Sequence, residues 1–110
     1  MTTAIQNENL ATAKTIRQQI MTGDFWCLAA CGARDYVILD ADDNRRGGLM
    51  FRVTIKPRTF HKIIIELTHM DLYLVKLVKI KRDYSVETVE ECDGVYCDML
   101  AEIVYHMCNK

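Results

Sequence analysis

The chain has 110 residues and a mass of 12.7 kDa, which is enough for one domain of ordinary size. Half of the residues are apolar, a share too high for a disordered segment, and one proline and five glycines exclude low-complexity and collagen-like chains. No apolar run approaches the roughly 20 residues that span a bilayer, and residues 1–20 lack the apolar region of a secretory signal. We expect a single domain over residues 9–110, preceded by a frayed or disordered segment over residues 1–8.

The formal net charge of −1 conceals an uneven distribution of charge along the chain. Residues 1–44 hold three basic and six acidic side chains, residues 45–82 hold ten basic and two acidic, and residues 83–110 hold one basic and seven acidic. The three segments therefore carry net charges of −3, +8 and −6. The basic middle segment is the main lead to a function, because positive potential attracts anionic partners.

Near the start of the chain, apolar residues recur at three- and four-residue steps, at Leu10, Ala13, Ile16 and Ile20. This spacing places them on one face of a helix. Asn9 or Thr12 can cap its start, and Gly23 can adopt the left-handed conformation that ends many helices. The pattern predicts a helix from Asn9 to Thr22.

The middle of the chain has the patterns of β-strands joined by turns. The clearest alternation of apolar and polar residues runs from Leu49 to Ile55, and Pro57 ends it because proline cannot donate to a ladder. The segments with strand patterns span residues 25–31, 36–39, 49–55, 61–67, 72–80 and 84–89. Their short connections favour an antiparallel meander over parallel units, which need long crossovers.

After Asp93 and Gly94 the apolar period becomes helical again, with a stripe formed by Tyr96, Met99, Ile103 and Met107. Acidic residues 90, 91 and 93 are then expected at the amino end of this second helix, where negative charge suits the helix dipole. We predict an α+β fold: an antiparallel meander sheet of four to five strands, with the N- and C-terminal helices packed on its apolar face. The predicted core contains Ile16, Ile20, Phe51, Val53, Ile63, Ile65, Leu67, Tyr73, Val75, Met99 and Ile103. The predicted exposed apolar residues, which would suit a homodimer or partner surface, are Leu72, Leu74 and Val78.

The cysteines are odd in number and follow no signal peptide, which favours free thiols in a reducing cytoplasm; they are Cys27, Cys31, Cys92, Cys97 and Cys108. On the predicted strand, Cys27 and Cys31 would lie ~13 Å apart, too far to share a zinc ion. We interpret Cys27, Cys31 and Cys97 as small buried apolar residues. No histidine is placed beside a thiol by spacing, so we expect no catalytic residue, no metal and no cofactor.

The polar loop over residues 40–48 resembles two ligand-binding loops only in part. It opens like a calcium loop but has Arg45 and Phe51 where glycine and glutamate are required. Arg45 and Arg46 precede two glycines without the spacing of a phosphate loop. Either the loop is a plain turn or it presents both arginines at its tip.

The basic middle segment supplies the candidate binding residues, which are Arg45, Arg46, Arg52, Lys56, Arg58, Lys62, Lys76 and Lys79. If they gather on one sheet face, they offer an anionic partner a stripe of positive potential. Alternatively, they are the ordinary solvated face of a one-sided sheet, or the acidic ends neutralise them. Tyr73 and Tyr84 are the candidate aromatics for stacking on bases, whereas Phe51 belongs to the apolar face. The acidic residues could instead mimic nucleic-acid phosphates; they are Glu87, Glu90, Glu91, Asp93, Asp98 and Glu102.

From Met21 onward the chain resembles a group of small, functionally uncharacterised phage and mobile-element proteins. The resembling segments are Met21-Thr22, Gly32–Asp35, Leu49–Arg52, Lys62–Leu67, Asp71–Tyr73 and Gly94–Leu100. The resemblance implies a short accessory protein of a phage or plasmid that modulates host enzymes or counters host defence by binding. We therefore expect a non-enzymatic protein in the cytoplasm of a bacterial host, with a host or phage protein as partner. The alternative is a small nucleic-acid-binding module that uses a basic sheet face.

Overall fold

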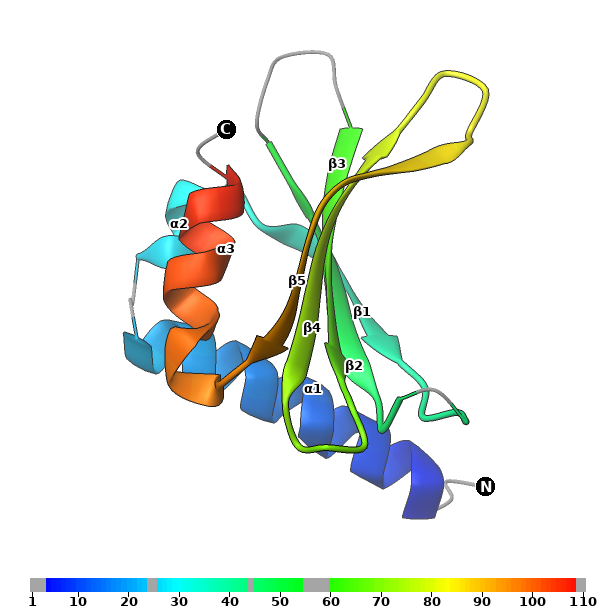
Figure 1. Ribbon diagram of the computed structural model, residues 1–110, viewed down its shortest axis with the longest axis vertical. Helices are drawn as coiled ribbons and strands as arrows, with labels where there is room; N and C mark the ends of the chain where they lie inside the picture. Colours follow the sequence, from blue (N-terminus) through cyan, green and yellow to red (C-terminus); the bar gives the residue numbers. More distant parts are fainter. Residues whose placement is uncertain (1–3, 24–25, 44, 55–59, 109–110) are drawn as a thin grey trace.

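Five antiparallel strands form one sheet whose order follows the chain, β1-β2-β3-β4-β5 (Figure 1). This computed structural model describes residues 4–23, 26–43, 45–54 and 60–108. The elements are α1 (Ala4–Gly23), α2 (Cys27–Ala30), β1 (Arg34–Leu39), β2 (Gly48–Val53), β3 (Phe60–Leu67), β4 (Tyr73–Ile80), β5 (Val86–Val95), the 3₁₀ turn η1 (Cys97–Met99) and α3 (Leu100–Cys108). The predicted α+β meander with terminal helices is confirmed.

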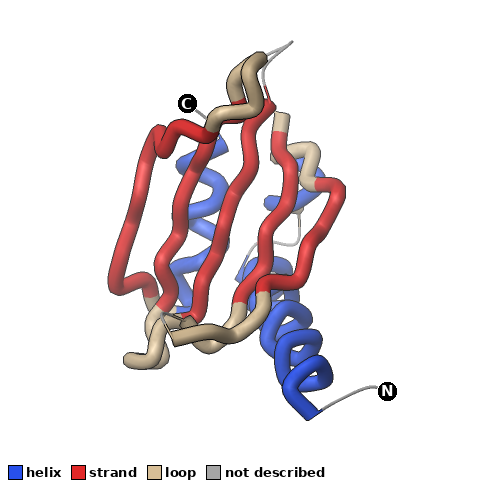
Figure 2. Tube along the Cα trace, turned by 90° about the vertical axis from the view of Figure 1, so that its right-hand side faces the viewer, coloured by secondary structure: helices blue, strands red, loops and turns tan. Residues whose placement is uncertain are grey.

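The helices lie on one face of the sheet, and Figure 2 shows the sheet from the other side with the helices behind it. Because side chains alternate along a strand, about every second residue of the central strands β2, β3 and β4 is buried beneath the helices. The buried strand residues are Leu49, Phe51, Val53, His61, Ile63, Ile65, Tyr73, Val75, Leu77 and Val95. The face away from the helices, called the open face below, carries Met50, Arg52, Phe60, Lys62, Ile64, Glu66, Leu74, Lys76, Val78 and Ile80. The prediction that the helices cover the apolar face is therefore confirmed.

The first helix, α1, begins at Ala4, before the expected start at Asn9, and it ends at Gly23 as predicted. Ala13, Ile16 and Ile20 are buried against the sheet, as their spacing requires. Within the described residues, no helix is long and apolar enough to cross a membrane.

The strand predicted over residues 25–31 is wrong, because its described part folds as the short helix α2. The amide of Ala30 donates to the carbonyl of Trp26 at 2.8 Å, and that of Cys31 to Cys27 at 3.0 Å. One helical turn brings Cys27 and Cys31 to the same side, and both are buried. The Cys27 thiol lies 3.5 Å from the Ala101 carbonyl oxygen, so α2 packs beside α3. An apolar run of this length indicates burial, but it does not distinguish a strand from a helical turn.

The second predicted helix starts later than expected, and this shift changes which of its residues are buried. Strand β5 continues to Val95 and includes acidic residues 90, 91 and 93, so they do not lie at a helix start. Tyr96 is extended and η1 follows it, so α3 begins only at Leu100. Its buried residues are Leu100, Ala101, Val104 and Met107. Met99, predicted as core, is exposed, whereas Leu67 and Ile103 pack partly buried against the core.

The apolar residues expected to be exposed on the strand predicted over residues 72–80 are less exposed than predicted. Leu72 and Leu74 are half-buried, and Val78 is buried although no helix covers it. Val78 lies in register between Lys62 on β3 and Thr88 on β5, whose side chains flank it on the open face. These residues therefore do not form the exposed apolar surface that the sequence predicted.

A buried tyrosine links the stability of this fold to alkaline pH. Burial raises the pKa of Tyr73 above its usual value of 10.0, and its hydroxyl donates to Gln19 Oε1 at 2.8 Å. A raised pKa means that the folded state holds the proton more tightly than the unfolded state. This contribution to stability is therefore complete below about pH 10 and is lost as the pH rises through the folded-state pKa. Tyr73→Phe removes the ionisable hydroxyl and therefore removes this pH dependence of stability.

We expect the wild type to exceed Tyr73→Phe by about 1 kcal/mol in free energy of unfolding at pH 8, the usual contribution of one hydrogen bond. The difference should shrink between pH 9.5 and 11, roughly the range over which tyrosine ionises. Urea denaturation of both proteins across this range measures the difference, and the other ionising groups cancel in it. A difference that stays constant with pH contradicts the prediction.

Candidate functional site

A recess of about 250 Å³ opens at the end of the open face where β2, β3 and β4 meet the β4–β5 hairpin. Its lining combines cations with aromatic rings and consists of Arg52, Phe60, Lys62, Ile80 and Tyr84. These five residues are called the aromatic recess below. They meet because Arg52 pairs with Lys62 across β2 and β3, and Phe60 pairs with Ile80 across β3 and β4.

Two exposed aromatic side chains frame the aromatic recess. Phe60 is 52% exposed and Tyr84 is 87% exposed, so both side chains are accessible to a ligand. Tyr84 also has a φ of 66° in the hairpin turn, a left-handed conformation that costs a residue with a Cβ about 1–2 kcal/mol. Such a turn position ordinarily favours glycine or asparagine. A strained, exposed aromatic residue beside two cations is a feature typical of binding sites.

The cations of the aromatic recess differ in how far neighbouring acids neutralise them. The Arg52 guanidinium stacks over Phe60, 4.8 Å from the ring centroid, and its Nη1 lies 3.2 Å from Asp35 Oδ2. Lys62 forms no ion pair with any described residue. Arg52 is therefore oriented by its two partners, and Lys62 keeps its full positive charge for a ligand.

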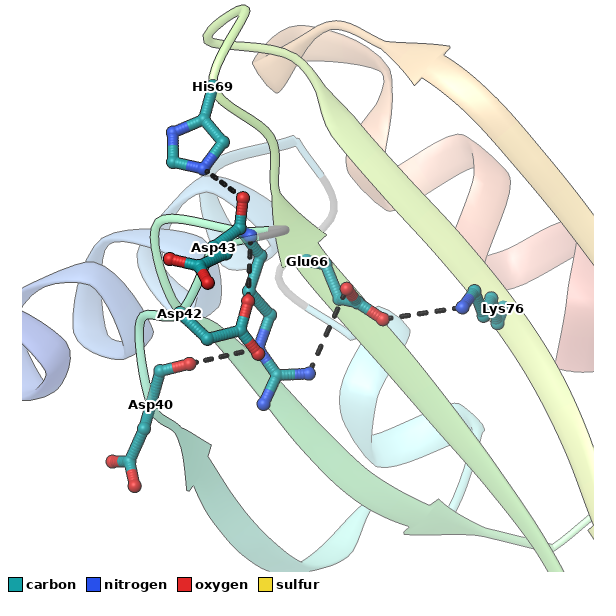
Figure 3. Close-up of polar contacts among 7 residues, drawn as sticks. Asp40, Asp42, Asp43, Glu66, His69 and Lys76 are labelled. Atoms are coloured by element: carbon teal, nitrogen blue, oxygen red, sulfur yellow. Dashed lines mark hydrogen bonds and ion pairs between the residues drawn. The ribbon is translucent and has the colours of Figure 1, made fainter.

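Three of the predicted binding residues lie away from the aromatic recess, and acidic side chains neutralise their charges. These residues are Arg45, Arg46 and Lys76. Glu66 lies between two cations: its Oε2 is 3.8 Å from Arg45 Nη1 and its Oε1 is 3.4 Å from Lys76 Nζ (Figure 3). Arg45 also donates from Nε to the Asp40 carbonyl at 2.9 Å. Arg46 pairs with Asp71.

Of the remaining predicted binding residues, Lys79 lies in the described part of the chain. Lys79 pairs in register with His61, which is buried on the helix-bearing face, so Lys79 does not share the open face with Lys62 and Lys76. Alternation of side chains along β4 is the reason, since Lys76 and Lys79 are three residues apart. Lys56 and Arg58 lie outside the described residues.

The cysteines are divided between the core and the surface. Cys27 and Cys31 are buried, as predicted, but Cys97 is exposed, contrary to the interpretation of it as a core residue. No three His, Cys, Asp or Glu side chains in the described ranges lie close enough together to hold a metal ion.

Sequence reasoning identified Arg52, Lys62 and Tyr84 but missed the contribution of Phe60. Phe60 is two residues before Lys62, so the period of a strand already puts both side chains on the same face. Tyr73, the other candidate for base stacking, is buried beneath the helices and is not available for it. The hairpin that brings Tyr84 to the aromatic recess has no signal in the sequence beyond its turn residues.

The geometry of the aromatic recess is the main guide to function, because the chain matches no protein-family model, no curated protein and no solved structure.

Proposed function

We propose that the protein is a non-enzymatic binding module that holds single-stranded nucleic acid on its open face. The observation that carries this proposal is the aromatic recess, in which two exposed rings stand beside Arg52 and Lys62. Aromatic side chains stack on unpaired bases, and neighbouring cations contact the phosphates between them. Both kinds of group are available together at this end of the sheet.

The proposal favours a single strand over a duplex because of the shape of the surface. Rings on a sheet face reach only bases that are unstacked from their neighbours, as in recognition of single-stranded RNA by open sheets. Reading a DNA duplex instead requires an element that enters a groove. Both terminal helices pack against the sheet, so neither is presented for that purpose.

The test is a titration of a fluorescent, mixed-sequence single strand of about 20 nucleotides, with binding measured by anisotropy at two salt concentrations. We expect Phe60→Ala to weaken binding by roughly five- to 150-fold, because stacking of one base on an aromatic ring contributes about 1–3 kcal/mol. Lys62→Gln should make the slope of log affinity against log salt shallower by about 0.7, the value for one phosphate contact on a single strand.

Lys79→Gln is the matched control, because Lys79 lies on the other face and forms no ion pair with the described residues. It removes the same charge and should leave the affinity and the salt dependence close to those of the wild type. The proposal is overturned if no single strand binds at low salt, or if Phe60→Ala has no effect. The proposal is also overturned if a duplex binds as tightly as the single strand and Phe60→Ala does not weaken that duplex binding.

A second candidate function is the one that the resemblance implies: a phage or plasmid protein that inhibits or modulates a host defence protein in the bacterial cytoplasm. A groove of about 320 Å³ between α1, α2 and β1 favours it. Trp26 is exposed beside this groove, and the Arg17 guanidinium stacks over Tyr36 at 5.2 Å. Tryptophan, tyrosine and arginine are the residue types that dominate binding energy at protein interfaces.

The two candidate functions depend on different residues, so the same variants separate them. A protein partner of the groove should lose affinity with Trp26→Ala and keep it with Phe60→Ala. Nucleic acid held at the aromatic recess should show the reverse pattern, which identifies the surface that each ligand uses.

A further inference from the structure

A row of three cations crosses the sheet at the end that holds the aromatic recess. Arg34 on β1 pairs in register with Arg52 on β2, and Arg52 pairs with Lys62 on β3. Residues directly opposite each other in antiparallel strands point to the same side, and neighbouring strands lie about 4.8 Å apart. The three side chains therefore form a row at right angles to the strands, called the cationic row below, which extends from the aromatic recess to the β1 edge.

Hydrogen bonds hold Arg34 in this row, although β1 is irregular after it. Its Nη1 donates to Thr54 Oγ1 at 2.8 Å and to the Gly32 carbonyl at 2.9 Å. Thr54 is two residues beyond Arg52, so this bond agrees with the register in placing Arg34 on the open face. Both acceptors are uncharged, so they orient the guanidinium without neutralising it.

One acid lies within the cationic row. Asp35 Oδ2 is 3.2 Å from Arg52 Nη1, whereas Arg34 and Lys62 form no ion pair with any described residue. The net charge of the row is therefore positive and attracts phosphates, and Asp35 opposes that attraction.

An uncharged row runs beside the cationic row. Phe60 pairs with Ile80, and Ile80 pairs with Val86, on the neighbouring strands β3, β4 and β5. Phe60 is two residues before Lys62, so the uncharged row lies about 7 Å from the cationic row, toward the hairpin that carries Tyr84. In each nucleotide the sugar separates the base from the phosphate, so a single strand presents its bases and its phosphates as two such rows.

The middle of the open face is less suited to a phosphate backbone. Lys76 Nζ lies 3.4 Å from Glu66 Oε1, and Lys76 is in register with the exposed Glu91 of β5. Two carboxylates beside one lysine repel phosphates. A single strand that followed β3 and β4 along their length would meet this repulsion, whereas one that crosses the sheet at the cationic row would avoid it.

We propose that the single strand crosses the sheet at right angles to the β-strands, with its phosphates on the cationic row and its bases on the uncharged row and Tyr84. Arg34 is then a binding residue beyond the aromatic recess, and Asp35 limits the affinity. This inference rests on the proposed function, and it adds the path of the ligand, which the aromatic recess alone does not define.

The salt dependence of binding tests this path, in the same anisotropy titration of a single strand. We expect Arg34→Gln to make the slope of log affinity against log salt shallower by about 0.7, the value for one phosphate contact. Arg34→Lys keeps the charge and should retain the wild-type slope, which separates loss of charge from a change in β1. Lys76→Gln is the matched control, because it removes one cation from the same face and should leave the slope unchanged.

Two acids of the open face, neutralised separately, test the path independently. Asp35→Asn should tighten binding roughly fivefold at low salt, because it removes a charge that repels a neighbouring phosphate. Asparagine tolerates the left-handed conformation of this residue, whose φ is 55°, so we expect the fold to be retained. Glu91→Gln removes the same charge beside Lys76 and should have a much smaller effect.

The path is overturned if Arg34→Gln leaves the slope unchanged, or if Lys76→Gln lowers the slope as much as Arg34→Gln does. It is also overturned if Glu91→Gln tightens binding as much as Asp35→Asn. These results leave the proposed function intact as long as the wild type binds and Phe60→Ala weakens binding. Absence of binding by the wild type overturns both.

Discussion

Replacing Gly48 with alanine is expected to destabilise the protein by more than about 3 kcal/mol, a large fraction of the stability of a typical domain. Gly48 is the first residue of β2 and lies between β1 and β3, paired with Leu39 and Glu66. A Cβ at this position would overlap the carbonyl oxygen of Ile65 and approach the Cα of Glu66 to 3.1 Å. Backbone atoms cannot rotate away, so the strands must separate and lose ladder hydrogen bonds.

Gly94→Ala is the matched control for this prediction. Gly94 has a φ of 65°, which alanine adopts at a cost of about 1–2 kcal/mol, but a Cβ there meets no atom within 4 Å. Thermal and urea denaturation of the two variants separates a steric clash from backbone strain. If Gly94→Ala is as destabilising as Gly48→Ala, the close approach of β2 to β3 is not the cause.

Leu100→Ala is expected to reduce the free energy of unfolding by about 2–5 kcal/mol, because the Leu100 side chain is completely buried and the surrounding core cannot fill the cavity. Met99→Ala should change it by less than about 1 kcal/mol, since Met99 is 39% exposed. The two residues are adjacent, so the pair of variants measures which side of the C-terminal helix faces the core.

Urea denaturation followed by circular dichroism gives both free energies. A larger loss for Met99→Ala than for Leu100→Ala contradicts the observed position of α3. It would instead support the helical stripe that the sequence pattern predicts, in which Met99 is a core residue.

The location of the candidate site could be predicted from the sequence only in part. The alternation of residues 49–55 and 61–67 correctly assigned Arg52 and Lys62 to the face opposite the core. It could not show that Arg45, Arg46 and Lys76 are paired with acids, since these pairs join residues on different strands and loops. Of the predicted binding residues that the structure describes, only Arg52 and Lys62 line the aromatic recess.

The charge distribution along the chain therefore overstates the charge that a partner meets. Residues 45–82 carry a net charge of +8, but Glu66 contacts two of their cations and Asp71 contacts a third. Asp35 and Glu87, from the flanking acidic segments, contact Arg52 and Lys81. Exposed ion pairs of this kind add little stability, yet each removes most of a cation's field at a distance.

The sequence by itself determined that consecutive strands are antiparallel neighbours in a meander, and it determined which face of the sheet is buried. Both follow from local properties, since a period of two defines two faces and short turns join only antiparallel neighbours. Tertiary structure alone decided that residues 27–30 form a helix, that Leu100 rather than Met99 is buried, and that Phe60 and Tyr84 meet beside Lys62. These outcomes depend on packing and charge between segments distant in the chain, and no local period of the sequence records such contacts.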